Sequence, residues 1–334
     1  MFYDFALTPD VFEYHVLKTG SDLGIVVVQI LRGIADNGTI ADLDQGRWLT
    51  YVMHNLANGR VPPELRDRVN ACLQVLANRN RLIRRSQTLM LSSSDELRWL
   101  AWALECHADA EFHGVIATEE LLAVSGMTNG VLIGLPSALE SRQWLERRRS
   151  IPLTKCEADY RKHLSPILRH AQKVTLIDPF LSPHKERYTR SVELISELVG
   201  QRGAYRRPGK IVIHSGDPVS EPRDARGVTY AESVASRLTA WEAFLKPLAT
   251  KWKHRLEVAL WRNKPSSKVF HDRYLITDQC GISTPAGLDC LDAGKGNNTD
   301  WSMLEFETLA DRLDDFNPSK SPYVHLLPGI KVLP

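Results

Sequence analysis

One short segment near the C-terminus carries a histidine, an aspartate and an arginine in consecutive positions. It reads KVFHDRYLITD from Lys268 to Asp278, and its aromatic and β-branched residues predict a β-strand over 271–277. Side chains of a strand alternate between its two faces, so we expect His271 and Arg273 on the same face. An imidazole beside a guanidinium is suited to attacking and holding a phosphate group. This segment is therefore the first candidate for a functional site.

The spacing of these residues resembles a known motif. His271-x-Arg273, followed after four residues by Asp278, is similar to the HxK(x)4D motif of the phospholipase D superfamily, with arginine in place of lysine. The upstream segment VTLIDPF resembles the opening strand and Asp-Pro-aromatic turn of these domains. HDRYLITD together with Gly-Leu-Asp at 287–289 resembles one branch of phospholipase D-like domains, found in bacterial proteins and in some eukaryotic membrane-remodelling proteins. The resemblance covers about 155–334. It implies a phospholipase D-like α/β sandwich with a central mixed sheet.

The resemblance also implies a chemistry that needs neither a metal nor a cofactor. His271 would attack phosphorus to form a phosphohistidine, which water then hydrolyses with a second histidine as acid and base. Arg273 would hold the non-bridging oxygens, and Asp278 would orient a histidine through its ring nitrogen. The chain has one such motif, so the resemblance implies a homodimer in which two copies of His271 face each other. His214, at the end of KIVIHSGDP, is the alternative second histidine within one chain.

Further polar residues are candidates for binding the substrate. Asp178 stands at the turn after the expected first strand, and the glycine-rich run after the motif supplies Ser283 and Asp289 as partial matches to the family's Gly-Ser-x-Asn run. Asn297 and Asn298 could supply an amide, and Glu305 stands near the position where the family often has an acid. Arginine in place of lysine keeps the charge but changes the shape of the donor, which favours phosphate binding over cleavage.

The composition describes an ordinary globular protein of two domains. The chain has 334 residues, 43% of them apolar and 25% charged. It has no apolar run of 18 residues, and the start MFYDFALTPD lacks the order of a signal peptide, so we expect a cytoplasmic protein without a membrane partner. Five cysteines without a CxxC pair indicate neither a disulfide framework nor a zinc site.

The two halves differ in their periodicity. Apolar positions at helical spacing over 22–35, 45–56 and 97–106 predict a mainly helical N-terminal domain at 1–150, suited to recruiting nucleic acid or a partner protein. The remainder, 151–334, alternates helical and strand-like segments and carries the phospholipase D-like motif.

Three functions are consistent with these patterns. The first is a metal-independent nuclease in a bacterial defence or mobile-element system, acting most readily on DNA. The second is a non-catalytic module that binds a phosphate group of nucleic acid or of a lipid headgroup, and the third is an assembly protein that docks a partner ATPase through its N-terminal domain. The net charge of +2 identifies no nucleic-acid binder by itself, but two basic clusters favour one. They are Arg142, Arg147, Arg148 and Arg149, and Arg202, Arg206, Arg207 and Lys210.

Overall fold

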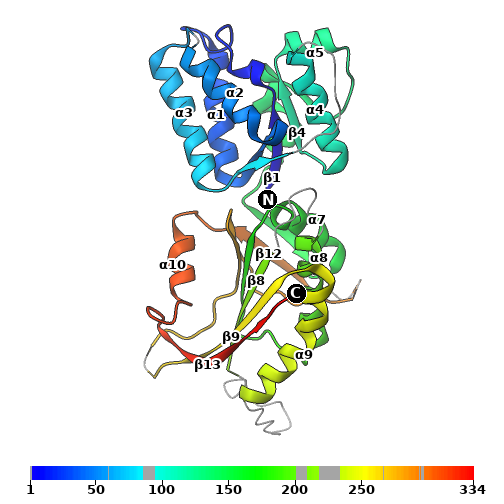
Figure 1. The fold of residues 1–334 in the computed structure, drawn as a ribbon, viewed down its shortest axis with the longest axis vertical. Coiled ribbons are helices and arrows are strands. Elements are labelled where there is room, and N and C mark those ends of the chain that lie inside the picture. The colour runs from blue at the N-terminus through cyan, green and yellow to red at the C-terminus, as the bar shows by residue number, and fades with distance from the viewer. Residues whose placement is uncertain are drawn as a thin grey trace. The chain divides into compact units, whose positions relative to one another are not determined.

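The protein folds into two α/β units. The computed structural model describes residues 2–58, 60–85, 95–200, 209–217, 234–265, 267–292, 294 and 297–334. The chain divides into a unit at Met1–Arg148 and a unit at Arg149–Pro334, close to the boundary expected from the sequence. Figure 1 shows both as ribbons.

The N-terminal unit is built on a parallel sheet of five strands in the order β3-β2-β1-β4-β5. In Figure 1, α1 and α3 lie to the left of β1 and β4, and α4 lies to the right, so helices flank the sheet on both sides. The strands are β1 (Tyr3–Leu7), β2 (Gly38–Asp42), β3 (Leu82–Arg84), β4 (Gly114–Ala117) and β5 (Leu132–Gly134). The helices are η1 (Pro9–Phe12), α1 (Asp22–Asn37), α2 (Leu43–Asn58), α3 (Pro63–Asn78), α4 (Asp95–Asp109), α5 (Glu119–Ser125), η2 (Leu135–Glu140) and α6 (Arg142–Leu145).

Helices hold most residues of the N-terminal unit, but the prediction of a mainly helical domain missed this sheet. The strands are three to five residues long, and β2 and β4 are buried at every position. A strand buried on both faces shows no alternation of polar and apolar residues, which is the pattern that identifies a strand in a sequence.

The C-terminal unit contains a mixed sheet of eight strands in the order β13-β9-β8-β7-β10-β11-β12-β6. The central strands β7, β8 and β9 are parallel, whereas β10 pairs antiparallel with β7. In Figure 1, α10 lies on one side of this sheet and α7, α8 and α9 on the other. The strands are β6 (Ser150–Thr154), β7 (Lys173–Ile177), β8 (Lys210–Gly216), β9 (Arg255–Asn263), β10 (Tyr274–Thr277), β11 (Gly281–Ser283), β12 (Asn298–Met303) and β13 (Tyr323–Val332). The helices are α7 (Glu157–Leu168), α8 (Glu186–Gly200), α9 (Val234–Trp252) and α10 (Thr308–Asp314).

The strand expected over 271–277 is shorter than predicted. Only Tyr274–Thr277 forms β10, and 271–273 is irregular backbone that leads into it. The alternation rule therefore does not govern His271 and Arg273, and their side chains need not share a face.

An aromatic cluster packs between the sheet and α10. Trp261, Phe270, Phe316 and Tyr323 are all buried there, and the Phe270 and Phe316 rings lie 4.9 Å apart between centroids. None of the helices within the described ranges is both long and apolar enough to cross a membrane.

Candidate functional site

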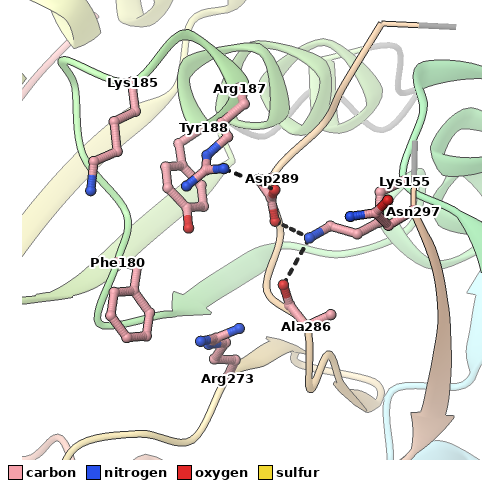
Figure 2. Close-up of a pocket in the computed structure, with 9 residues that line it drawn as sticks. All are labelled: Lys155, Phe180, Lys185, Arg187, Tyr188, Arg273, Ala286, Asp289 and Asn297. Carbon is pink, nitrogen blue, oxygen red and sulfur yellow. Dashed lines mark hydrogen bonds and ion pairs between the residues drawn. The ribbon is translucent and has the colours of Figure 1, made fainter. Parts of the chain in front are cut away.

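A cavity of about 340 Å³ lies where β7 ends and β10 begins. The carboxyl ends of parallel strands are the usual place for ligands in an α/β sheet, and β7 is one of the parallel strands here. Figure 2 shows the nine residues that line the cavity. They are Lys155, Phe180, Lys185, Arg187, Tyr188, Arg273, Ala286, Asp289 and Asn297.

Arg273 lies at one wall of this cavity and is held by three neighbours. Its Nη1 donates to the carbonyl of Pro285 at 3.0 Å, and its guanidinium lies over the Phe180 ring, 4.6 Å from the centroid. Its Nε lies 3.8 Å from Asp178 Oδ1, too far for a hydrogen bond, and this buried nitrogen has no hydrogen-bond acceptor within the described ranges. Arg273 is thus fixed in place at the wall of the cavity.

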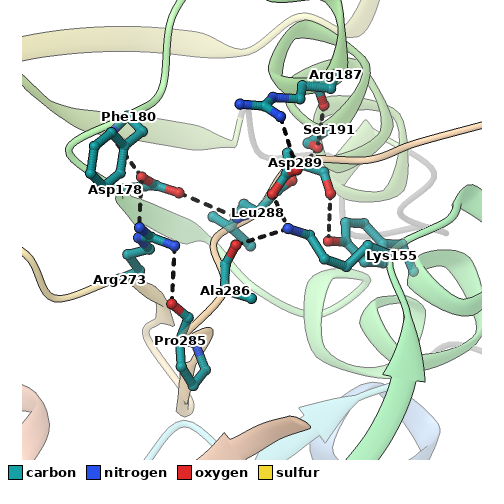
Figure 3. Close-up of polar contacts among 11 residues, drawn as sticks. Lys155, Asp178, Phe180, Arg187, Ser191, Arg273, Pro285, Ala286, Leu288 and Asp289 are labelled. Atoms are coloured by element: carbon teal, nitrogen blue, oxygen red, sulfur yellow. Dashed lines mark hydrogen bonds and ion pairs between the residues drawn. The ribbon is translucent and has the colours of Figure 1, made fainter. Parts of the chain in front are cut away.

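Asp178 lies beside Arg273 but does not line the cavity. The side chain is fully buried, and its two oxygens accept hydrogen bonds from the amides of Phe180 at 2.8 Å and Leu288 at 3.3 Å (Figure 3). Burial raises the pKa of this carboxyl, while the two amides and Arg273 oppose the shift. Asp178 therefore joins the turn after β7 to the loop after β11.

Lys155 and Asp289 form a buried ion pair on the opposite wall. Their side chains are only 7% and 8% exposed, which places the pair out of contact with most solvent. Lys155 Nζ also donates to the carbonyl of Ala286 at 2.8 Å, and the Tyr160 hydroxyl donates to the carbonyl of Asp289 at 3.0 Å. The charge of Lys155 is thus balanced inside the protein.

The remaining cations give the cavity its positive character. Lys185 and Arg187 project from the start of α8 and the turn before it, across the cavity from Arg273 (Figure 2). Arg187 is 49% exposed, and its nearest carboxylate oxygen, on Asp289, lies 3.9 Å away. Four cationic side chains line the cavity together with one carboxylate, that of Asp289. Such an arrangement favours an anionic ligand.

His271 lies outside this arrangement. The residue is exposed and does not line the cavity. The neighbouring Asp272 forms ion pairs with Lys268 at 3.0 Å and with Arg312 at 3.9 Å, so the backbone of this segment is tied towards α10. The expected nucleophile therefore does not line the cavity that contains the arginine expected to hold its substrate.

His214 belongs to the aromatic cluster and cannot serve as the second histidine. Its Nδ1 accepts a hydrogen bond from Trp261 Nε1 at 2.9 Å, and its ring lies 5.0 Å from the Phe316 ring. Burial, followed by Lys173 and His325, lowers the pKa of His214 to about 3. A buried imidazole that stays neutral and is occupied by an indole is a structural residue.

Asp278 also has a structural position rather than the expected one. It follows β10 at the end opposite Arg273, where Oδ1 accepts hydrogen bonds from the amides of Gln172 at 2.8 Å and Lys173 at 3.3 Å. The carboxylate thereby fixes the entry of the chain into β7. Asp278 does not line the cavity that contains Arg273.

Four of the predicted substrate-binding residues do not line the cavity either, and Asp178 is one of them. Ser283 pairs within the sheet between β10 and β12, and Asn298 accepts from the Thr154 hydroxyl at 3.3 Å. Glu305 forms an ion pair with Arg149 at 2.6 Å. Of the predicted site residues, the structure brings together Arg273, Asp178 and Asp289.

Most of the cavity's lining was missed in the sequence. Phe180 belongs to the Asp-Pro-aromatic turn, which offered a signal, and Lys185 and Arg187 form a basic pair soon after it. Lys155 and Tyr188 had no local signal, whereas Asn297 was named with Asn298 as a possible amide donor. Asn297 precedes β12, and its carbonyl accepts from the Lys155 amide at 3.1 Å, a contact made only by the folded sheet.

The basic clusters make structural contacts where they are described. Arg142 pairs with Glu146 at 2.7 Å, and the Arg147 guanidinium lies 3.2 Å from the centroid of the Trp144 ring. Lys210 pairs with Glu257 at 2.8 Å. The other members of the second cluster, Arg202, Arg206 and Arg207, lie outside the described residues.

Comparison with known proteins adds little to the geometry. No protein-family model matches the sequence, and no curated protein matches it. Among solved structures, the chain is similar to TrmBL2, an archaeal chromatin protein that shows a novel mode of DNA binding. The match has 14% sequence identity and a TM-score of 0.28, and it covers 91% of this chain and 94% of that chain. At these values it supports no conclusion about this chain.

Proposed function

We propose that the C-terminal unit binds a phosphate group in this cavity without cleaving it. The observation that carries the proposal is the position of Arg273, held by Pro285, Phe180 and Asp178, across from Lys185 and Arg187. Arginine binds phosphate oxygens through paired N–H donors, and a guanidinium held in advance loses less entropy on binding.

Binding without cleavage follows from the positions of the nucleophiles. A histidine that attacks phosphorus must place its ring nitrogen about 3–3.5 Å from the phosphorus atom of the bound substrate. His271 does not line the cavity, and His214 is buried against Trp261. The Tyr188 hydroxyl does line it, but burial raises its pKa, so the reactive phenolate is disfavoured. The cavity can therefore hold a phosphate without activating an attack on it.

The resemblance to the phospholipase D superfamily supports a phosphate group as the ligand. That phosphate group can belong to nucleic acid, to a phosphorylated small molecule or to a lipid headgroup. A fluorescently labelled single-stranded DNA, titrated with protein in the presence of EDTA, tests the proposal. We expect saturable binding that Arg273→Gln weakens, with the DNA recovered intact. Arg190→Gln is the matched control, because Arg190 lies on the same helix as Arg187 but pairs with Glu186 and Asp292.

A second candidate function is a metal-independent phosphodiesterase completed by a second copy of the chain. The exposure of His271 supports it, since an exposed histidine can face its copy across a twofold axis. Cleavage in EDTA by the parent protein, lost in His271→Ala, is the expected result for this candidate. Equal activity of the two proteins would remove it.

A further inference from the structure

The ion pair between Arg187 and Asp289 is too long for a hydrogen bond. Arg187 Nη1 lies 3.9 Å from Asp289 Oδ2, whereas a hydrogen bond between such atoms spans about 2.7–3.2 Å. Both residues line the cavity, and Figure 2 shows the contact between them. No residue within the described ranges makes a hydrogen bond to Asp289 Oδ2. The pair therefore presents a donor and an acceptor side by side at the cavity wall.

Neighbouring contacts set the width of this gap. Asp289 is held by its ion pair with Lys155. The backbone carbonyl of Arg187 accepts from the amide of Cys290 at 2.8 Å, and the Arg187 guanidinium lies 5.2 Å from the centroid of the Tyr188 ring. The backbone that carries the arginine is thus bonded to the residue after Asp289, so the two groups are positioned before a ligand arrives.

A hydroxyl is the ligand group that satisfies both members of the pair. Its oxygen can lie about 2.8 Å from each of two atoms that are 3.9 Å apart, accepting from Arg187 and donating to Asp289. A deprotonated phosphate oxygen cannot donate to Asp289, and an ammonium group cannot accept from Arg187. The pair thus selects a hydroxyl although its own charges balance each other.

Arg273 lies across the same cavity from this pair (Figure 2). The cavity, of about 340 Å³, is within the size range of small-ligand sites and has room for a phosphate group and the carbon atoms next to it. One molecule that carries both groups can place its phosphate at Arg273 and its hydroxyl between Arg187 and Asp289. Within a strand, a DNA nucleotide has no free hydroxyl, whereas a ribonucleotide keeps its 2′-hydroxyl beside the phosphate.

We propose that the cavity recognises a phosphate ester with a hydroxyl group close to its phosphate, and that Arg187 and Asp289 bind this hydroxyl. The inference rests on the proposed function and narrows the ligand of the same site. The 2′-hydroxyl of RNA and the hydroxyl of a small polyol phosphate offer the same chemistry, which DNA lacks within a strand.

The test uses matched probes that differ in one hydroxyl, bound to the full chain in EDTA at about pH 8, where a phosphomonoester has lost its second proton. The first set is an RNA strand, its 2′-O-methyl form and a DNA strand, all with the same bases. The second set is glycerol 3-phosphate and propyl phosphate. We expect the hydroxyl-bearing probe of at least one set to bind at least about tenfold more tightly, the size expected for hydrogen bonds to charged groups.

The two sets distinguish the sources of the ligand. A preference for the RNA strand identifies RNA, whereas a preference confined to glycerol 3-phosphate identifies a polyol phosphate. The 2′-O-methyl strand should bind no more tightly than DNA, because its oxygen has no proton to donate to Asp289.

Arg187→Met should abolish the preference, because it removes the donor and leaves Asp289 paired with Lys155. Arg190→Met is the matched control, since Arg190 lies on the same helix and pairs with Glu186 and Asp292. Arg273→Gln should instead weaken the binding of both probes of a set by the same factor, because the phosphate is common to both.

Equal affinity for the hydroxyl-bearing and hydroxyl-free probes of both sets, weakened in Arg273→Gln, would overturn the hydroxyl inference while leaving phosphate binding in place. A preference that survives in Arg187→Met would overturn it as well. If no probe binds, or if Arg273→Gln changes nothing, both the inference and the proposed function fail.

Discussion

Gly287 lies so close to Asp178 that a Cβ atom on Gly287 would come within 2.9 Å of Asp178 Oδ2. The same atom would lie 3.3 Å from Arg273 Nη1. The Gly-Leu-Asp segment thus has a distinct task at each position. Gly287 allows the close approach, the Leu288 amide binds Asp178, and Asp289 pairs with Lys155.

Replacing Gly287 with alanine should therefore destabilise the C-terminal unit and displace Arg273. The φ of Gly287 is +87°, so the substitution adds backbone strain to the steric contact, and the free energy of unfolding should fall by about 1–3 kcal/mol. Urea denaturation measures this change. Gly294→Ala is the control, since Gly294 has a φ of +80° and, among the residues that the structure describes, no atom lies within 4 Å of its Cβ position. Equal losses in the two variants would show that the contact with Asp178 is unimportant.

Removing Lys155 alone should be costly because it leaves the Asp289 carboxylate buried. Lys155→Met should lower the free energy of unfolding by about 3–5 kcal/mol, as is usual when one member of a buried pair is removed. The double variant Lys155→Met/Asp289→Asn should lose less than the sum of the single losses, because no unpaired charge remains. Additive losses in urea denaturation would contradict a direct pairing.

His214 predicts a specific dependence of stability on pH. Its pKa is lowered from 6.5 to about 3 in the folded protein, so between these values the unfolded chain binds a proton that the folded chain does not. The stabilisation is complete above pH 6.5 and is lost as the pH falls towards 3, by up to about 1.4 kcal/mol per pH unit.

His214→Gln keeps an acceptor for Trp261 and removes this titration, while His325, whose pKa is also lowered, stays in both proteins. Between pH 7 and pH 4.5 the parent protein should therefore lose more stability than the variant. If the parent protein and His214→Gln lose the same free energy of unfolding over this pH range, His214 is protonated in the folded state as readily as in the unfolded chain.

His271→Ala should leave both stability and phosphate affinity unchanged. The side chain is exposed and outside the cavity, so the free energy of unfolding should shift by no more than about 0.5 kcal/mol. Calorimetric titration with inorganic phosphate measures the affinity. A tenfold loss of affinity in His271→Ala would place this histidine in the binding site after all.

Helices and strands could be predicted from the sequence where a segment has a clear local pattern. They could not be predicted where they depend on contacts between distant parts of the chain. Helices such as α1 were found because their apolar spacing is regular, and β8 was found because residues 211–213 form a run of β-branched residues. β1 and β2 were missed because short buried parallel strands do not alternate. β13 pairs with β9 through a bulge between Leu326 and Ile330, which interrupts its pattern.

The same distinction explains the site. Arg273, Asp178 and Asp289 came from motifs that keep their spacing, so the sequence could find them. His271 and Arg273 are two residues apart, yet of the two only Arg273 lines the cavity, and irregular backbone stands where the motif predicted a strand. Lys155 reaches the cavity from the end of β6, and only the strand order of the sheet brings it beside Asp289.

The most direct test of the account is a calorimetric titration of the full-length protein with inorganic phosphate, comparing the parent with Arg273→Gln and Arg190→Gln. We predict one saturable site per chain, retained in Arg190→Gln and weakened at least about tenfold in Arg273→Gln, because Arg273 lines the cavity and Arg190 does not. Equal phosphate affinity in Arg273→Gln and the parent would contradict the account.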